Sequence, residues 1–291
     1  MLTSAHPCPG TRELLSLRLS VLSSGSSGNA AYIESTGGQG VLVDAGISCK
    51  RLDALLQSLG RCLDDLGAVL LTHGHSDHTR GVRRLVERTG VEVYSAPGVG
   101  EGFGARIVES GQEIVLGRLR VVFFEVPHDT PTYGLRISDG SSAVGLATDL
   151  GEIGEETLRR LRGVEALVLE ANHDEDWLWG GPYPRELKRR VSSAAGHLSN
   201  AQAAEAALAL VSHGLKDLVL AHLSAKNNSP ARACGIAGSV LRRAGFGAVR
   251  VRAALAGRPT PWIEVGEPLA AHDYVYRYAA TDAAGQLFEV E

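Results

Sequence analysis

The sequence predicts an α/β fold, because short apolar segments of strand character alternate along the chain with segments of helical periodicity. Polar residues follow several of the apolar segments directly, as in α/β proteins, which collect reactive groups along one edge of their sheets. The composition is globular, with 44% hydrophobic and 21% charged residues. The alternation runs on without a linker, which predicts one domain over residues 17–265, after a loose leader (1–16) and before an appended β-hairpin (266–291).

The first third of the chain contains four expected strands, at 17–22, 30–34, 41–43 and 69–71. A Gly/Ser-rich turn, Ser23 to Asn29, joins the first two. Leucines at i, i+3, i+4 and i+7 predict a helix over 50–59. A second helix is expected from His78 through Arg88, with Ser76 or Asp77 as its N-cap.

The rest of the chain continues the same plan. A serine or asparagine at 199–200 is the expected N-cap of a helix over 200–211, and Pro230 suits the first position of a helix that ends at Arg243. A helical stretch is also expected at 155–161. The expected strands are 91–94, 121–126, 142–147, 166–169 and 218–221, with the hairpin formed by 274–278 and 286–290.

Composition excludes several classes of protein. The net charge of −4 provides no overall positive field for coating nucleic acid, although a local basic site remains compatible with it. No apolar run approaches the roughly 20 residues that cross a bilayer, so we expect a cytoplasmic protein with no membrane partner. The four cysteines are scattered, which argues against a disulfide framework or a zinc knuckle.

The chemistry is concentrated in the segment His73-Gly74-His75-Ser76-Asp77-His78. Three histidines and an aspartate within six residues, between a strand and a helix, would crowd partly charged groups together unless a cation neutralised them. Six contiguous residues cannot easily wrap four side chains around one ion, which favours two metals with a bridging carboxylate. Asp149 is the candidate bridge; alternatively it caps the helix at 155–161.

The segment Thr72 to His78 resembles the T-H-x-H-x-D-H signature of the metallo-β-lactamase superfamily, which implies a four-layer αββα sandwich. By this resemblance Asp44 corresponds to the first motif, where it would be an outer acceptor orienting a ligand histidine. The remaining ligands follow in the family's order. The resemblance implies one ion on His73, His75 and His128, another on Asp77, His78 and His222, and Asp149 as bridge.

Three further loops, SSGSSGNA, GHLSNAQAA and HLSAKNNSP, are similar to the YycJ (WalJ) group of this superfamily, over about residues 17–254. Members of that group act as exonucleases on DNA 5′ ends. The resemblance therefore implies a two-metal phosphodiesterase that attacks DNA, more than RNA, from the 5′ end with a metal-bridging hydroxide. The His/Asp ligand set suits Zn²⁺ and Mn²⁺ alike.

Asp77, Asp149 and His197 are the candidate catalytic residues. His197 resembles the histidine that phosphodiesterases of the superfamily place beside the scissile phosphate, where it would protonate the leaving oxygen or bind the phosphate. Alternatively it lies in a helix-capping loop. His173 also follows an expected strand, and we give equal weight to a role for it in the site and to a structural role.

Backbone contacts to the substrate are expected from Lys188 and Arg189, which lie near His197 in sequence, whereas Arg83-Arg84 and similar pairs are interpreted as solvated helix faces. Two loops could donate to a terminal phosphate, or the first could be a plain hairpin turn. Their candidate residues are Ser24, Ser27, Asn29, Lys226, Asn227 and Asn228.

Two other functions compete with the nuclease. The same fold could hydrolyse a small thioester, lactone or lactam, but the loops at 196–204 and 222–230 speak against it. A non-catalytic metal-stabilised binding protein would be expected to lack a ligand, and none of the seven is missing here.

Overall fold

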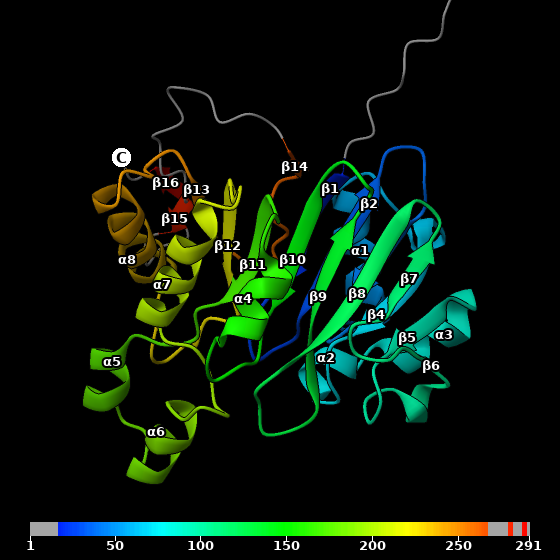
Figure 1. Ribbon diagram of the computed structural model, residues 1–291. Helices are drawn as coiled ribbons and strands as arrows, with labels where there is room; N and C mark the ends of the chain where they lie inside the picture. The colour runs from blue at the N-terminus through cyan, green and yellow to red at the C-terminus, as the bar shows by residue number, and fades with distance from the viewer. Residues whose placement is uncertain (1–16, 267–278, 282–286, 290–291) are drawn as a thin grey trace, which may run out of the picture.

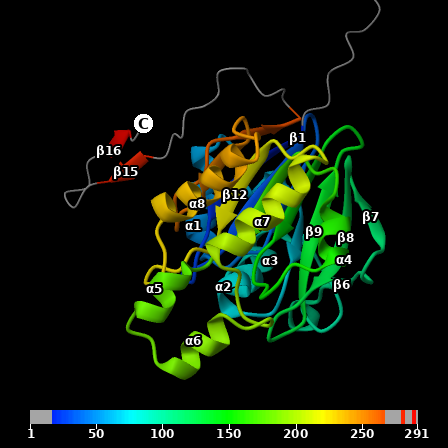
Figure 2. The same ribbon diagram turned by 60° about the vertical axis from the view of Figure 1, so that its left-hand side comes forward.

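The computed structural model describes residues 17–266, 279–281 and 287–289. Two seven-stranded sheets pack face to face, and helices cover the outer face of each, as Figures 1 and 2 show. This is the predicted four-layer αββα sandwich. No helix in the described part of the chain is both long enough and apolar enough to span a membrane.

The first sheet mixes antiparallel and parallel pairs. Strands β14, β1, β2 and β3 pair antiparallel, and β3 to β6 continue in parallel. In sheet order the strands are β14 (Ile263–Val265), β1 (Leu17–Ser23), β2 (Ala30–Ser35), β3 (Gly40–Val43), β4 (Leu66–Leu71), β5 (Glu92–Ser95) and β6 (Arg106–Ile107).

The second sheet has the same plan, with four parallel strands joined to an antiparallel meander. In sheet order its strands are β13 (Arg250–Ala253), β12 (Asp217–Ala221), β11 (Ala166–Glu170), β10 (Ala143–Ala147), β9 (Thr132–Ser138), β8 (Leu119–Val126) and β7 (Glu113–Leu116). A separate antiparallel pair joins β15 (Ala279–Thr281) to β16 (Leu287–Glu289); the first strand expected for the hairpin, 274–278, lies outside the described residues.

Alternation along β11 shows why the second sheet is apolar on both faces. Ala166 and Val168 point into the core shared by the two sheets, while Leu167 and Leu169 point to the helices outside. Those helices are α4 (Glu155–Leu161), α7 (Asn200–Val211) and α8 (Pro230–Arg243); α1 (Cys49–Ser58) and α3 (Val82–Thr89) cover the first sheet.

Most predicted elements form within one or two residues of the expected ends. Ser199 and Ser229 cap α7 and α8 by accepting hydrogen bonds from the N–H groups of Gln202 and Arg232. Asp149 caps no helix, because the N-cap of α4 is Gly154. Sequence reasoning did not anticipate β6, β7, β9, β13, β14, α5 (Glu175–Gly180) or α6 (Arg185–Val191).

The single helix expected from His78 to Arg88 was wrong in one respect. Two helices occur, α2 (Ser76–Thr79) and α3, and the N-cap of α2 is His75, which makes no side-chain capping bond. The break lies at Gly81, whose N–H donates to the carbonyl of Ala45 instead of continuing the helix. A Cβ at Gly81 would lie 2.1 Å from the carbonyl oxygen of Ile47, so the two loops meet too closely for any side chain.

A candidate two-metal centre at the strand ends

The candidate ligands meet where strands from both sheets end. His73 and His75 follow β4, His128 follows β8, Asp149 follows β10, and His222 follows β12. The connections bring these ends to one edge of the sandwich because β4, β10 and β12 run in parallel with their neighbours.

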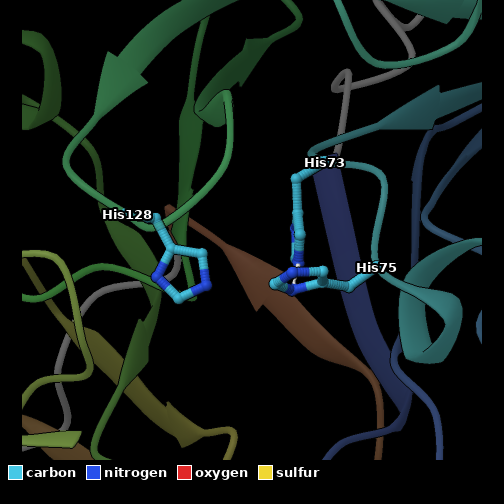
Figure 3. A group of neighbouring side chains, drawn as sticks. All are labelled: His73, His75 and His128. Carbon is cyan, nitrogen blue, oxygen red and sulfur yellow. Dashed lines mark hydrogen bonds between the residues drawn. The ribbon is translucent and has the colours of Figure 1, made fainter. Parts of the chain in front are cut away.

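One group of histidines comes from both sheets. Figure 3 shows the rings of His73 and His75 turned toward that of His128 across the space between the sheets. The Nε2 of His73 lies 3.2 Å from the Nδ1 of His75. One nitrogen from each of the three rings lies within 4.8 Å of the others. This spacing allows the three imidazoles to hold one cation.

A second group lies beside it. Asp77, His78 and His222 also place one donor atom each within 4.8 Å of one another. Asp149 contacts this group, with Oδ2 3.1 Å from His78 Nε2 and Oδ1 3.3 Å from His222 Nδ1. Asp149 also forms a ligand group with His73 and His78. Its carboxylate therefore lies between the two sets of histidines.

The donor set fits divalent cations. Among the described residues, three buried atoms of these side chains make no hydrogen bond of normal geometry, namely His128 Nε2, Asp149 Oδ2 and His222 Nε2, and their nearest polar neighbours are other candidate ligands or Asp129. Buried polar atoms that lack a well-formed hydrogen bond are costly, so several of them at one place indicate a ligand. Nitrogen and carboxylate donors together are typical of zinc and manganese sites.

Burial and neighbouring charges set the protonation of the ligands. Burial, assisted by the positive charge of His78, lowers the pKa of His73 to about 2, so its ring is neutral and able to bind a cation. Burial alone would lower the pKa of His78, but the carboxylates of Asp149 and Asp44 raise it to about 10. A cation that displaced this proton would take over its role of balancing the carboxylates.

Asp44 contacts the ring of His78 and the start of the loop that carries the histidines. Its Oδ2 is 2.7 Å from His78 Nδ1, and its two oxygens accept from the N–H and hydroxyl of Thr72. Asp44 therefore fixes the ring of His78 and the start of the histidine-bearing loop at once.

His197 lies against the same centre, 3.9 Å from Asp149 through its Nδ1. Its Nδ1 is 2.8 Å from Oε1 of Glu170, and the Nδ1 of His222 is 2.8 Å from the same oxygen. Burial would lower the pKa of His197, but Glu170 raises it overall. The two rings are thus linked through one fully buried carboxylate.

Glu170 is the main residue that sequence reasoning missed. It is the last residue of β11, and its second oxygen, Oε2, accepts from the N–H groups of Leu150 and Leu198. Its position at the end of a parallel strand, beside β10 and β12, was the available signal. Asp129 was also missed; its Oδ1 lies 3.5 Å from His75 Nε2 and 3.3 Å from His128 Nε2.

Several expected substrate contacts have positioning roles instead. The Ser24 hydroxyl accepts from the N–H of His222, Asn29 lies 2.9 Å from His78 Nε2 through its amide nitrogen, and Asn228 donates to the carbonyl of Ala171. His173 and Asn227 are likewise buried. Because these side chains lie inside the protein, their predicted direct contact with a substrate is not favoured.

The other expected contacts remain accessible. Ser27, Arg189 and Lys226 are exposed, and Lys188 is partly exposed while its Nζ donates to the carbonyl of Trp179. Lys226 also lies 5.5 Å from the ring of Tyr183. Lys188 and Arg189 lie on α6, and Lys226 lies in the loop between β12 and α8.

An αββα sandwich with a histidine and aspartate cluster at its strand ends defines a metal-dependent hydrolase of the metallo-β-lactamase fold. Residues 39–223 match the family model described as "Beta-lactamase superfamily domain", and the chain belongs to this family.

Two curated relatives cover most of the chain. It is 35% identical to "Exodeoxyribonuclease WalJ" of Streptococcus pneumoniae over 228 residues, 74% of this chain and 84% of the relative. It is 33% identical to "Exodeoxyribonuclease YycJ" of Bacillus anthracis over 245 residues, 80% of this chain and 92% of the relative.

The fold is also that of solved structures. The metallo-beta-lactamase fold protein YhfI from Bacillus subtilis aligns with a TM-score of 0.67 at 20% identity, over 84% of this chain and 99% of that one. Human tRNase Z, short form, aligns with a TM-score of 0.60 at 15% identity, over 86% of this chain and all (100%) of that one.

Proposed function

We propose that this protein is a two-metal DNA exonuclease that removes nucleotides in the 5′→3′ direction. The observation that carries the proposal is His197, which lies beside a complete set of metal-binding groups and is held by Glu170. A sixth imidazole next to the centre suits a reaction whose leaving oxygen needs a proton, as in phosphodiester cleavage. The names of the two relatives support DNA as the substrate.

In this proposal His73, His75 and His128 would hold one ion, Asp77, His78 and His222 would hold the other, and Asp149 would contribute its carboxylate to both. Zn²⁺ and Mn²⁺ both suit these ligands. When bound, such ions supply an activated water and stabilise negative charge on the phosphate oxygens.

The chain's own residues then manage the proton of the leaving group. The Nδ1–H of His197 donates to Glu170, which leaves Nε2 as the atom that can give a proton. Glu170 also raises the pKa of His197, so the ring keeps its proton to a higher pH than an isolated buried imidazole would. His197 thus acts as the general acid, and Glu170 orients it.

The DNA strand is proposed to pass along α5 and α6, which project beside the site in Figures 1 and 2. Trp177 and Trp179 on α5 are 42% and 49% exposed, although large apolar side chains are usually buried. Lys188 lies beside them, since its Nζ donates to the carbonyl of Trp179, and exposed aromatic rings near cationic side chains form the combination that binds single-stranded DNA, by stacking on bases and pairing with phosphates.

The decisive experiment compares nucleic acid with small substrates. Purified protein loaded with Zn²⁺ or Mn²⁺ is given 3′-labelled DNA and RNA oligomers with 5′-phosphate or 5′-hydroxyl ends. We expect stepwise shortening of DNA from its 5′ end. Turnover of a thioester or lactam with no cleavage of any oligomer would overturn the proposal in favour of a small-molecule hydrolase.

Two variants connect the activity with the residues. Asp149→Asn should abolish cleavage, and asparagine is chosen because it tolerates the left-handed backbone that Asp149 adopts, with φ of 59°. His197→Ala should lose about 10²–10⁴-fold in kcat while its metal content stays at the wild-type level. Full turnover by His197→Ala with intact metal would remove the general-acid role.

A further inference from the structure

A basic cavity lies behind the metal-binding loop. Its volume is about 520 Å³, and it is formed by the start of α1, the end of α2 and one face of α3. The residues that line it and carry the argument are Ser48, Cys49, Lys50, Arg80, Arg84 and Arg88. Lys50 and three arginines therefore converge on one concave space from three segments of the chain.

The positive charge of this cavity is only partly neutralised. Arg88 pairs with Asp53 at 2.9 Å, and Arg84 pairs with Glu87 at 3.2 Å. Among the described residues, no carboxylate pairs with Lys50 or Arg80. The first turn of α1 contains no acidic residue, so the partial positive charge of its free N–H groups adds to the side chains. The cavity is thus suited to an anion.

The cavity shares its wall with the catalytic loops. Arg80 directly follows α2, which carries Asp77 and His78, and its Nη1 donates to the carbonyl of Ser27 at 3.3 Å. In Figure 1, α2 and α3 lie on one side of the strand ends, whereas α5 and α6 lie on the other. A DNA strand that reaches the metal centre along α5 and α6 and continues across it would therefore run toward this cavity.

We propose that this cavity binds a backbone phosphate of the DNA strand whose end occupies the metal centre, which rests on the proposed function. A guanidinium group can donate two parallel hydrogen bonds to the oxygens of a phosphate, and the ammonium group of a lysine adds a mobile point charge. Binding to a phosphate carries no sequence information, so it would position the strand for repeated cuts without restricting which nucleotides are removed.

The test uses the Lys50→Ala/Arg84→Ala double variant, because both side chains are exposed and their removal leaves no buried gap. Arg83→Ala is the matched control: it removes the neighbouring exposed charge of α3, which does not line the cavity. Binding of cleavage-resistant phosphorothioate oligomers of 2 and 12 nucleotides is measured by anisotropy across a salt series. Cleavage of the corresponding phosphodiester oligomers is measured in parallel.

We expect the double variant to bind the 12-mer about tenfold more weakly than the control does. The slope of log K against log salt should be smaller by about 0.7 for each phosphate that the double variant no longer neutralises. Its kcat/KM should fall more on the 12-mer than on the dinucleotide. Equal binding of the 12-mer by the double variant and Arg83→Ala at every salt concentration would overturn the proposal. Absence of cleavage by the wild type would instead overturn the proposed function.

Free phosphate is the other source of the same chemistry, and a separate measurement distinguishes it. Sodium phosphate is titrated into the wild type and the double variant while the melting temperature is recorded. Stabilisation of the wild type alone, together with equal 12-mer binding by the two proteins, would show a site for a small anion and contradict binding of the strand. Weaker 12-mer binding by the double variant supports binding of the strand whether or not phosphate stabilises the wild type.

Discussion

Replacing Glu170 by glutamine tests whether one buried carboxylate organises both His197 and His222. Oε1 faces the two imidazole Nδ1 atoms, and Oε2 faces the N–H groups of Leu150 and Leu198. A carboxylate accepts at both oxygens, but a glutamine amide presents one NH₂ group. If the NH₂ group takes the place of Oε1 it faces the two imidazole Nδ1–H groups, and if it takes the place of Oε2 it faces the two backbone N–H groups. In either orientation a donor faces two donors, so two hydrogen bonds are lost.

The size of the effect follows from those hydrogen bonds. A hydrogen bond to a charged group contributes roughly 1.5–3 kcal/mol, so removing two costs about 3–6 kcal/mol, divided between folding and the organisation of the site. Loss of a group that orients a metal-bound histidine typically weakens metal binding about 10–100-fold. Misalignment of the general acid should lower kcat by about 10²–10⁴-fold.

The assay measures three properties of Glu170→Gln: metal content after dialysis, kcat on a 5′-phosphorylated oligomer, and the pH dependence of kcat. Because Glu170 raises the pKa of His197, removing its charge should lower that pKa, and the alkaline limb of the profile should move to lower pH. Glu205→Gln on the exposed face of α7 is the matched control. Wild-type values of all three properties in Glu170→Gln would refute the reasoning.

Three further outcomes are expected. Chelation of the metal should abolish hydrolysis and lower the melting temperature, and added Zn²⁺ or Mn²⁺ should restore both. The melting temperature should change because a ligand at 100 times its Kd stabilises a protein by about 2.7 kcal/mol. Activity in metal-free protein would contradict this prediction. Glu34, buried between Arg18 and Arg61, would have a raised pKa from burial alone, but the two guanidinium groups hold its pKa below 4.5. The ion pairs of Glu34 therefore stabilise the fold above about pH 4.5, and this stabilisation is lost as the pH falls through the lowered pKa. The unfolding free energies of the wild type and Glu34→Gln should differ by about 3 kcal/mol at neutral pH and converge in acid. A difference that stays unchanged down to pH 3 would argue against the pairing. Gly46→Ala would place a Cβ 1.6 Å from the carbonyl oxygen of Asp77, so it should destabilise the fold and lower the metal content. Gly102 has open space around it, so Gly102→Ala should do neither. Equal melting temperatures of the two variants would rule out this close packing.

Local signals were sufficient for the elements whose ends are set by their own residues. The helices α7 and α8 begin where Ser199 and Ser229 supply side-chain caps, and α1 follows the spacing of its leucines. The candidate metal ligands also follow apolar strands whose parallel arrangement brings their ends together, but His128 and His222 were singled out among the strand-end residues only by the family resemblance.

The features that were missed depend on residues distant in sequence. The edge strand β14 forms because Ile263 pairs with Leu19, and the break before α3 arises where Gly81 packs against the loop at 45–47. Helices α5 and α6 are too short to show an apolar period. Glu170 followed an apolar strand, but nothing local indicated that two histidines from other segments would share its carboxylate.

Backbone conformation adds a reason why these residue types occupy the strand ends. Among the described residues, only Asp44, Asp149 and His222 combine a side chain with a positive φ, at 58°, 59° and 54°. This conformation costs roughly 1–2 kcal/mol for most residues, and aspartate tolerates it better than most. Each turn is held in place: Asp44 N–H donates to the carbonyl of Leu70, His222 N–H donates to the Ser24 hydroxyl, and the N–H after Asp149 donates to Glu170. At these turns the three side chains meet the same group of residues, because Asp44 contacts His78 and Asp149 contacts both His78 and His222. Aspartate and histidine are both among the residues that adopt positive φ more often than most, so their presence at the three positions satisfies both the backbone and the chemistry.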